Sequence, residues 1–386
     1  MKSKLIILTS HSTFESGGVG THLATMKSSL SNKNHTFILG LSKKESFVAK
    51  VISTFLNLIG FESVSLIVKS LSLYKELNNV LQKNIGTHSY DIITHDRYSA
   101  LAAIIAKYRN KDKISITQVL HAPFSEQFLI TSNNKTIYAM AKFLDIAISK
   151  QIDKVIGVDQ LQIDLEKKIE CDNTDKKYIV VPNAIDVKKL DLVNTSAFGR
   201  NKYAVIVRHL HEKNGVEYGV RGAINYISKS SNPIFDKLLV IGSGPLKEKL
   251  HKEFHEDIKA NLIEFKGSLS NMEALSFIKN AEISIVPSIP VGNYIEATSL
   301  TMLESMYLKT PLIASNIGGL ADTINHLKNG FLVEPREHEQ ITEIIFEIEK
   351  GTYDIEKIKE TAYVNVLENY SSEKWMNKIL KFSESE

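Results

Sequence analysis

Short runs of isoleucine, valine and leucine recur along the 386-residue chain and constrain its fold more than any other feature. Runs with little polar alternation are typical of strands that are buried on both faces, as in a parallel sheet. The segments between the runs are long enough for the crossover helices that parallel strands require. The sequence therefore predicts an α/β fold, with strands expected at Leu5–Thr9, Thr36–Leu41, Ile92–Thr94, Ile114–Leu120, Lys154–Val158, Tyr178–Val181, Ala204–Val207, Lys237–Ile241, Ile263–Lys266, Ile283–Val286 and Leu312–Ala314.

The expected elements form two successive α/β halves, and the chain is long enough for two domains. Residues 193–201, with the sequence V-N-T-S-A-F-G-R-N, are small and polar and are typical of a linker. We therefore expect a first domain of residues 1–190, a second of residues 191–370, and a C-terminal helix, residues 371–386, that packs back on the first. In such proteins ligands bind at the carboxyl ends of the strands and in the cleft between domains.

The composition argues against several classes of protein. The chain has 47 Lys+Arg and 44 Asp+Glu, and this near balance gives no basis for nucleic-acid binding. Its single cysteine, Cys171, excludes an intrachain disulfide framework and a multi-cysteine zinc site. The N-terminal apolar run is too short for a secretory signal, and no stretch reaches the roughly 18 apolar residues of a membrane span. We therefore expect a cytoplasmic protein.

Residues 283–333 are the most informative part of the sequence. After a predicted strand comes the string Glu296-Ala-Thr-Ser-Leu-Thr-Met-Leu-Glu304, in which Thr298 and Ser299 are good candidates to cap a helix. The free amides at such a helix start bind anions, and a carboxylate within the helix can accept hydrogen bonds from a ribose diol. Alone, Glu304 would be an ordinary solvated carboxylate. Together these features predict a site for a nucleotide-diphosphate sugar.

Two cations follow the first predicted strand of the second half. Arg208 and Lys213 are five residues apart, and together they can neutralise a diphosphate, the arginine as a bidentate fork and the lysine as a point charge. For an isolated pair of this kind, a solvated surface position is the alternative. Further on, Gly242-Ser-Gly244 lacks the third glycine of the dinucleotide-binding fingerprint, so we expect only a turn that lines the cleft.

The first half carries a glycine-rich turn and two histidines. Gly17 and Gly18 follow the first predicted strand, where glycine allows the backbone to approach a phosphate, although a plain strand-to-helix turn is the alternative. His95 and His121 each follow a later predicted strand. Both are therefore expected at the carboxyl edge of the sheet, although a lone histidine near a strand end is usually structural.

Taken together, these motifs resemble the family 4 retaining glycosyltransferases, which have the GT-B fold of two Rossmann-like, doubly wound parallel-sheet domains that face a cleft. The family pattern is Glu, seven residues, Glu, Gly-x-Pro, a strand, Gly-Gly and a later Asn-Gly. The resemblance covers nearly the whole chain and is weakest between residues 43 and 84. The matching residues here are Glu296, Glu304, Lys309-Thr-Pro311, Gly318-Gly319 and Asn329-Gly330.

The resemblance implies a retaining, metal-independent hexosyltransferase that moves a sugar from a UDP- or GDP-sugar to an acceptor hydroxyl in the synthesis of bacterial surface polysaccharide or glycoconjugate. No cofactor is implied, because the nucleotide sugar is the donor substrate. Glu304 would bind the ribose, Glu296 the donor sugar, and residues 267–272 the base. The implied catalytic residues are Glu296, His121, Lys213 and Arg208, and the implied nucleotide-binding residues are Gly17, Gly18, Arg208, Lys213, Gly242, Gly267, Met272, Thr298, Ser299, Leu300 and Glu304.

Two departures from the family pattern leave alternatives open. Residues 297–299 are Ala-Thr-Ser where the family has Gly-Phe-Gly, and Asn214 is inserted between Lys213 and Gly215. A non-catalytic scaffold subunit of GT-B-like fold and a nucleotide-sugar epimerase of the same fold are therefore kept as alternatives. The chain has no Asp-x-Asp, which argues against the metal-dependent arrangement of other transferases.

Residues 43–83 combine apolar helical stripes with six lysines. Two core-facing helices of the first domain are one interpretation, and a helix on a membrane surface is the other. Because the family uses this region for lipid-linked or polymeric acceptors, peripheral contact with the inner face of the cytoplasmic membrane is a hypothesis. The expected partners are thus a nucleotide-sugar donor and a glycan or lipid-linked acceptor, without nucleic acid.

Overall fold

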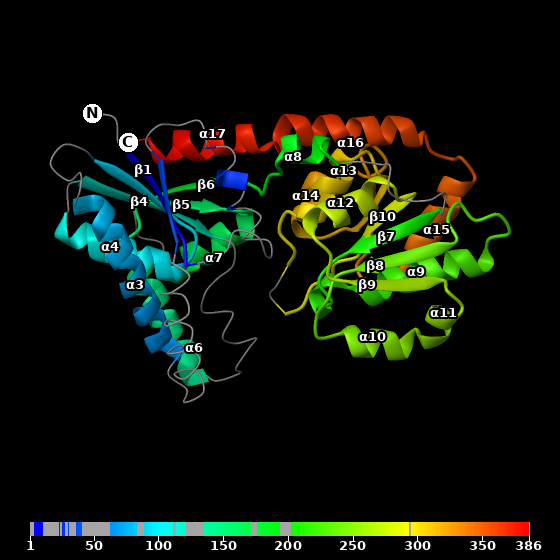
Figure 1. The fold of residues 1–386 in the computed structure, drawn as a ribbon, viewed down its shortest axis with the longest axis horizontal. Helices are drawn as coiled ribbons and strands as arrows, with labels where there is room; N and C mark the ends of the chain where they lie inside the picture. The colour runs from blue at the N-terminus through cyan, green and yellow to red at the C-terminus, as the bar shows by residue number, and fades with distance from the viewer. Residues whose placement is uncertain are drawn as a thin grey trace. The chain divides into compact units, whose positions relative to one another are not determined.

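The computed structural model describes residues 4–10, 23, 25–27, 30, 36–40, 62–82, 89–110, 113–120, 135–170, 176–193, 202–292 and 295–385. The chain divides into two compact units, unit 1 with Met1–Pro182 and Trp375–Glu386, and unit 2 with Asn183–Lys374. Each unit contains a sheet with helices packed on it (Figure 1).

Unit 1 has a described sheet of six strands in the order β2-β1-β3-β4-β5-β6, and every pairing in it is parallel. This order is that of a flavodoxin-like doubly wound sheet, in which the chain changes direction between β1 and β3. The strands are β1 (Lys4–Leu8), β2 (Thr36–Leu39), β3 (Tyr90–Thr94), β4 (Ile114–Leu120), β5 (Lys154–Gly157) and β6 (Lys177–Val180).

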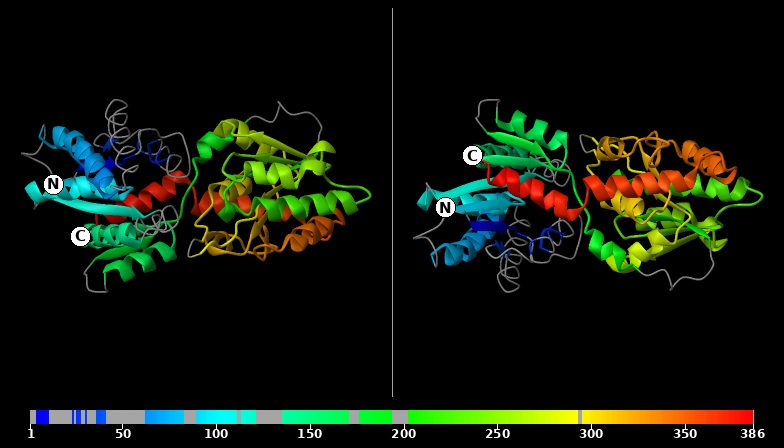
Figure 2. Two further views of the ribbon diagram at one scale, coloured as in Figure 1. Left: turned by 90° about the horizontal axis from the view of Figure 1, so that it is seen from below. Right: turned by 90° about the horizontal axis from the view of Figure 1, so that it is seen from above.

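The helices of unit 1 cover both faces of this sheet. Leu73, Leu77 and Leu81 recur every four residues along α3 and enter a shared core with α4, α6 and the strands. On the other face lies α17 (Figures 1 and 2), whose Ser383 carbonyl accepts a 2.7 Å hydrogen bond from Lys154 Nζ in β5. The described helices are α3 (Glu62–Gln82), α4 (Arg97–Arg109), α6 (Lys135–Ser149), α7 (Gln160–Glu170) and α17 (Ser372–Ser383).

Unit 2 also has a six-stranded parallel sheet, in the order β12-β11-β10-β7-β8-β9. Numbered from its own first strand, this is the 3-2-1-4-5-6 arrangement of Rossmann folds read from the opposite edge. The strands are β7 (Tyr203–Val207), β8 (Lys237–Ile241), β9 (Ile263–Gly267), β10 (Ile283–Val286), β11 (Leu312–Ser315) and β12 (Phe331–Val333).

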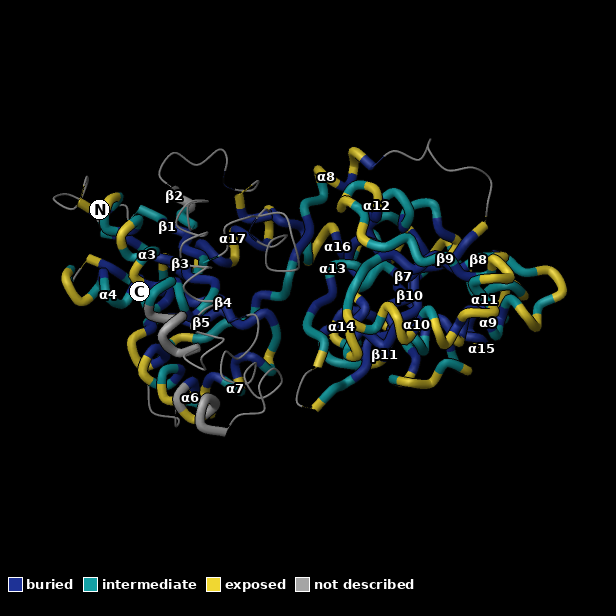
Figure 3. Tube along the Cα trace, turned by 60° about the horizontal axis from the view of Figure 1, so that its bottom comes forward, coloured by how far each residue is buried: buried dark blue, intermediate teal, exposed yellow. Residues whose placement is uncertain are grey.

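Successive residues of β7 enter two different cores, as the alternation of side chains along a strand requires. Ala204 and Ile206 pack with α9 and α15, whereas Tyr203 and Val205 pack with α12 and α13. In Figure 3 the strands are coloured as buried, and the exposed residues lie on turns of the helices.

The helices of unit 2 in the described residues are α8 (Val187–Asp191), η2 (a 3-10 turn, Glu212–Asn214), α9 (Val216–Lys229), α10 (Lys247–Glu253), α11 (His255–Lys259), α12 (Asn271–Lys279), α13 (Leu300–Tyr307), α14 (Gly318–Thr323), α15 (His338–Glu349) and α16 (Ile355–Asn369).

The expected α/β fold with parallel sheets is confirmed, and the eleven expected strands correspond to β1 through β11 with ends that differ by at most two residues. The three-residue strand β12 was not expected, because Phe331–Val333 is shorter than the runs that identify the other strands. None of the described helices is long and apolar enough to cross a bilayer. Cys171 and most of the expected linker lie outside the described residues.

Candidate functional site

The strand order of unit 2 places a crevice at the carboxyl ends of β7 and β10. The chain leaves β7 toward β8 on one side of the sheet and leaves β10 toward β11 on the other, while β7 and β10 pair directly. At such a switch point the two following loops separate and leave room for a ligand. Here the loop after β7 begins with Arg208, and the loop after β10 carries Ser288 and Glu296.

Arg208 is the centre of the polar contacts in this crevice. Its Nη2 lies 2.9 Å from Glu296 Oε2, and the two side chains are only 9% and 15% exposed. The same Nη2 lies 2.6 Å from Asn214 Oδ1 and 2.8 Å from Ser288 Oγ. Its Nη1 donates to Ser299 Oγ at 3.0 Å. The guanidinium is therefore held among one carboxylate and three neutral oxygens.

The loop between β10 and α13 is fixed at several points. Ser299 is the N-cap of α13 and accepts a hydrogen bond from Met302 N, which satisfies one of the free amides of the helix start. Asn183 Nδ2 donates to the Thr298 carbonyl at 3.0 Å, and the Glu296 carbonyl accepts from Gly319 N at 3.0 Å. Thr298 and Leu300, which are both expected to contact the nucleotide-sugar donor, therefore lie on either side of the Ser299 cap at the start of α13.

Gly318 permits the close approach of α14 to this loop. Its φ is +44°, and a Cβ at this position would lie 2.3 Å from the Glu296 carbonyl oxygen. A side chain would thus both strain the backbone and push Glu296 away from Arg208. The Gly-Gly of the sequence pattern has a steric reason in this structure.

Glu304 lies in the second turn of α13 and is 8% exposed, unlike the solvated helix carboxylate that a lone glutamate would be. Burial raises the pKa of its carboxyl to about 7, while a hydrogen bond with Asn271 and the charge of Lys189 act in the opposite direction. A buried carboxyl of this kind gains from a ligand that donates hydrogen bonds to it, as a ribose diol would.

Lys213 and the inserted Asn214 form a 3-10 turn directly before α9, and Gly215 follows as the N-cap of that helix. The Lys213 carbonyl accepts from Ile289 N at 2.9 Å, so this turn is tied to the loop after β10. The insertion places Asn214 in the interior, 5% exposed, with its Nδ2 donating to the His209 carbonyl at 2.6 Å. The departure from the family spacing thus adds a polar group that contacts Arg208.

The other expected nucleotide-binding residues of unit 2 lie at the ends of β8 and β9. Gly242 N donates to the Gly267 carbonyl at 2.8 Å, which joins the two strand ends. A Cβ on Gly267 would have no atom within 4 Å, so open space lies beside it. Met272 is in the first turn of α12, where it packs on the core, after a capping box formed by Ser270 and Glu273.

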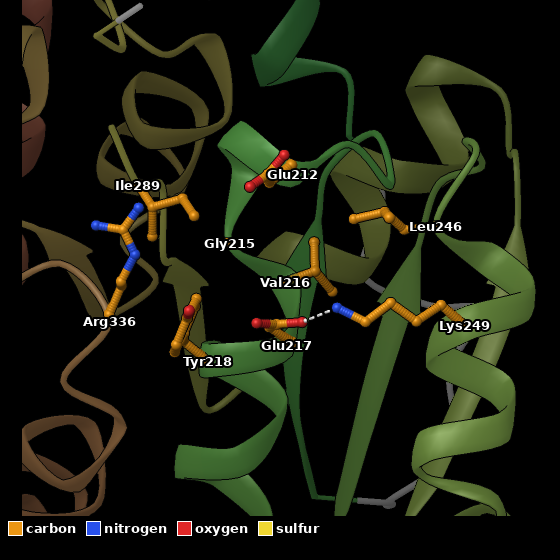
Figure 4. Close-up of a pocket in the computed structure, with 9 residues that line it drawn as sticks. All are labelled: Glu212, Gly215, Val216, Glu217, Tyr218, Leu246, Lys249, Ile289 and Arg336. Atoms are coloured by element: carbon orange, nitrogen blue, oxygen red, sulfur yellow. Dashed lines mark hydrogen bonds and ion pairs between the residues drawn. The ribbon is translucent and has the colours of Figure 1, made fainter. Parts of the chain in front are cut away.

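A second hollow of about 220 Å³ opens at the same edge of the sheet, over the start of α9 (Figure 4). Lys249 Nζ pairs with Glu217 at 2.9 Å, while Tyr218, Ile289 and Arg336 form the opposite wall. None of its nine lining residues, all in the described part of unit 2, is among those expected from the sequence. Two of its lining residues, Gly215 and Ile289, directly follow Asn214 and Ser288, so the hollow borders the contacts of Arg208.

In unit 1 the corresponding edge is described only in part. Gly17, Gly18 and His121 lie outside the described residues. His95 is buried after β3, and the next residue, Asp96, caps α4 and accepts a 2.8 Å hydrogen bond from Ser10 N after β1. The ends of β1 and β3, where this sheet changes direction, are thus held together by one carboxylate.

The structure brings Arg208, Glu296 and Ser299 into direct contact, with Lys213 in the turn beside them. Sequence reasoning missed Asn183, Asn214 and Ser288. The position of Ser288, two residues after a predicted strand, and the insertion at Asn214 were the available signals for two of them. In the described part of the chain, no three His, Cys, Asp or Glu side chains cluster as metal ligands do.

Comparisons with known proteins identify the same part of the chain. Residues 187–364 match the family model of glycosyl transferases group 1. An uncharacterized glycosyltransferase of Methanocaldococcus jannaschii is 25% identical over 170 residues, which are 44% of this chain and 41% of that protein. This chain therefore spans less than half the length of that relative.

Two further similarities extend over nearly the whole chain. N-acetyl-alpha-D-glucosaminyl L-malate synthase of Bacillus anthracis is 23% identical, covering 97% of this chain and 94% of that protein. The structure of Anabaena HepE in complex with UDP aligns with a TM-score of 0.70 at 13% identity, covering 98% of both chains. At this identity the likeness shows the fold, which is GT-B. Residues 187–364 are thus similar to the glycosyl transferases of group 1, and the two units have the GT-B fold.

Proposed function

We propose that the protein is a retaining, metal-independent glycosyltransferase that moves a sugar from a UDP- or GDP-sugar to an acceptor hydroxyl. One observation carries the proposal. Arg208 is nearly buried at the switch point of unit 2, in contact with both the first glutamate of the family pattern and the hydroxyl that caps α13. The HepE structure holds UDP in a protein of the same fold, which supports a nucleotide donor.

The proposed chemistry needs positive charge where the leaving group departs. As the glycosidic bond of the donor breaks, negative charge develops on the diphosphate, and groups already in place stabilise it. Arg208 and the amides at the start of α13 supply this stabilisation, and Lys213 adds a second cation. In this proposal neither a metal nor a cofactor takes part.

The two glutamates have separate roles in the proposal. Glu304 accepts hydrogen bonds from the ribose hydroxyls, which replace the water that burial removes from its carboxyl. Glu296 accepts hydrogen bonds from the donor sugar. Gly242, Gly267 and Met272 line the path toward the base.

Unit 1 is proposed to hold the acceptor, a glycan or a lipid-linked molecule. His121 would lie near the reaction centre, and Gly17 and Gly18 near the diphosphate. The proposed role is the synthesis of bacterial surface polysaccharide or glycoconjugate in the cytoplasm.

Release of nucleotide from a panel of UDP-, GDP- and ADP-sugars tests the proposal, because water can replace an unknown acceptor. We expect release from one donor, and we expect Glu296→Ala and Lys213→Ala each to remove most of it while the fold stays intact. Lys252→Ala, an exposed lysine on α10, is the matched control and should behave as wild type. A protein that releases no nucleotide would be a scaffold, and one that returns an altered nucleotide sugar would be an epimerase.

We also propose that residues 43–83 contact the inner face of the membrane. In α3, Leu73, Leu77 and Leu81 belong to the core of unit 1, whereas Leu71 and Lys75 are exposed. Residues 43–61 lie outside the described part of the chain. Cosedimentation with anionic liposomes at low salt tests the contact, and a protein that stays in the supernatant contradicts it.

A further inference from the structure

The hydrogen bonds of Arg208 are unevenly distributed over its guanidinium group. Nη2 has three acceptors within 2.9 Å, on Asn214, Ser288 and Glu296. A guanidinium Nη carries two hydrogens, so one of these acceptors is in excess. The Nε–H of the same side chain is buried and has no hydrogen-bond partner among the described residues. The group thus has a surplus acceptor on one nitrogen and an unused donor on another.

The three acceptors differ in how firmly they are held. Asn214 is 5% exposed, and its amide nitrogen is engaged by the His209 carbonyl. Ser288 is fully buried, two residues beyond the end of β10. Glu296 has the longest of the three distances, and its side chain is 15% exposed. It is also the only one whose charge an incoming anion could replace.

Arg208 keeps both Nη2 hydrogens satisfied when Glu296 departs, because Asn214 and Ser288 remain. A buried ion pair is costly to break when one charge is left without compensation. That cost is small here only if an anion takes the place of the carboxylate and the carboxylate finds new donors. A diphosphate provides the first condition, and the hydroxyls of a sugar provide the second.

We propose that Glu296 is the exchangeable partner of Arg208: the diphosphate of the donor takes its place on the guanidinium, including the unused Nε–H, and the released carboxylate turns to the donor sugar. This inference rests on the proposed nucleotide-sugar donor. Asn214 and Ser288 act as positioning residues that hold Arg208 during the exchange. A nucleoside diphosphate without a sugar displaces Glu296 but offers it no hydroxyls, so the product is bound more weakly than the donor.

The test is the affinity of the purified protein for UDP, GDP and ADP, measured by calorimetry for wild type and for Glu296→Gln. Glutamine keeps the size and the oxygen acceptor but loses the charge that competes with the diphosphate. We expect the variant to bind its nucleoside diphosphate roughly tenfold more tightly, as the loss of a charged competitor predicts, while sugar transfer falls. Glu296→Ala is the second variant and should change the affinity in the same direction.

Glu253→Gln is the matched control, because it removes the carboxylate that forms an ion pair with the exposed Arg221 in the same unit. Its affinity should equal that of wild type. If both Glu296 variants bind the nucleoside diphosphate as wild type does or more weakly, the proposed exchange is wrong, whereas the proposed donor stands. If neither wild type nor the variants bind any of the three nucleotides, both the exchange and the proposed donor are wrong.

Discussion

Arg97 in unit 1 and Arg208 in unit 2 are both nearly buried, and each follows the carboxyl end of a central strand, yet their surroundings differ. Arg97 gives each of its nitrogens one acceptor, with Nε on Asp145 at 2.8 Å, Nη1 on Gln118 at 2.7 Å and Nη2 on Glu166 at 2.7 Å. Arg208 has three acceptors on Nη2, while its Nε has none in the described part of the chain.

The comparison separates a structural arginine from one that can receive a ligand. Two carboxylates surround Arg97, and Lys176 lies close enough for their charges to interact. Burial lowers the pKa of Lys176 to about 8, while Glu166 acts in the opposite direction. All the charges of this cluster face one another inside unit 1. Arg208 has one carboxylate, which is partly exposed, and therefore keeps the capacity to bind an external anion.

The largest expected effect is on stability and comes from Arg97→Met. The substitution keeps most of the side-chain volume but leaves Asp145 and Glu166 buried without their cation. Removing one member of a buried ion pair costs about 3–5 kcal/mol of unfolding free energy, and urea unfolding measures it. Arg208→Met in the same assay should cost clearly less, because Glu296 can reach water. Equal losses from the two variants would show that Arg208 is as structural as Arg97.

The second effect concerns activity, which the Arg208 substitution should reduce more than the Arg97 substitution. Arg208→Met should reduce nucleotide release by about 10²–10³-fold, the usual cost of removing one preorganised group that stabilises developing charge. Arg97→Met should retain the wild-type rate per folded molecule. Arg221→Met, which removes an exposed arginine from unit 2, is the control. Wild-type turnover by the Arg208 variant would show that Arg208 is not part of the active site.

Much of the fold could be predicted from the sequence because a strand buried on both faces leaves a clear apolar run. The strands Ile114–Leu120, Lys237–Ile241 and Ile283–Val286 have the expected ends. β12 has three residues and owes its place to pairing with β11, which a local pattern does not contain. The strand order, and with it the crevice between β7 and β10, likewise arises from pairing between distant segments.

The site could be predicted only as far as its charged residues. Arg208 and Glu296 were identified by spacing, but their mutual contact spans 88 residues of sequence. In the sequence, Asn214 is a departure from the family spacing after Lys213. Its contact with Arg208 depends on the 3-10 turn, which directs the Asn214 side chain inward. The burial of Glu304 was also not readable, because it depends on Asn271 and the packing of α13 against α12.

The third prediction sharpens the comparison through two buried glutamates. Glu166 has Arg97 as a partner, whereas Glu304, among the described residues, has a hydrogen bond with Asn271 and a charge interaction with Lys189. Burial raises the pKa of Glu304 to about 7 in the folded protein from 4.5. Between these values the folded state binds more protons than the unfolded state, so stability falls as pH rises and is lowest above pH 7, by about 3 kcal/mol for this group.

The measurement is urea unfolding of wild type and Glu304→Gln at pH 5 and pH 8. Since glutamine does not titrate, the difference in unfolding free energy between the two proteins isolates this one carboxyl. Wild type should lose stability relative to the variant on going to the higher pH. A difference that is the same at both values would show that Glu304 is as well compensated as Glu166.

The smallest effect concerns the hydroxyl that joins Arg208 to α13. Ser299→Ala removes both an N-cap and the acceptor of Arg208 Nη1, and loss of a cap costs about 1 kcal/mol. Asp354→Ala removes the cap of α16, where the Asp354 side chain accepts a hydrogen bond from Lys357 N. Both variants should lose similar stability, but only Ser299→Ala should also weaken binding of a nucleoside diphosphate, because Arg208 is then less well oriented. Equal affinities in the two variants would mean that Asn214 and Ser288 alone hold the guanidinium of Arg208. The difference between Arg208 and Arg97, in which every guanidinium nitrogen has an acceptor, would then lie only at Nη2 and Nε.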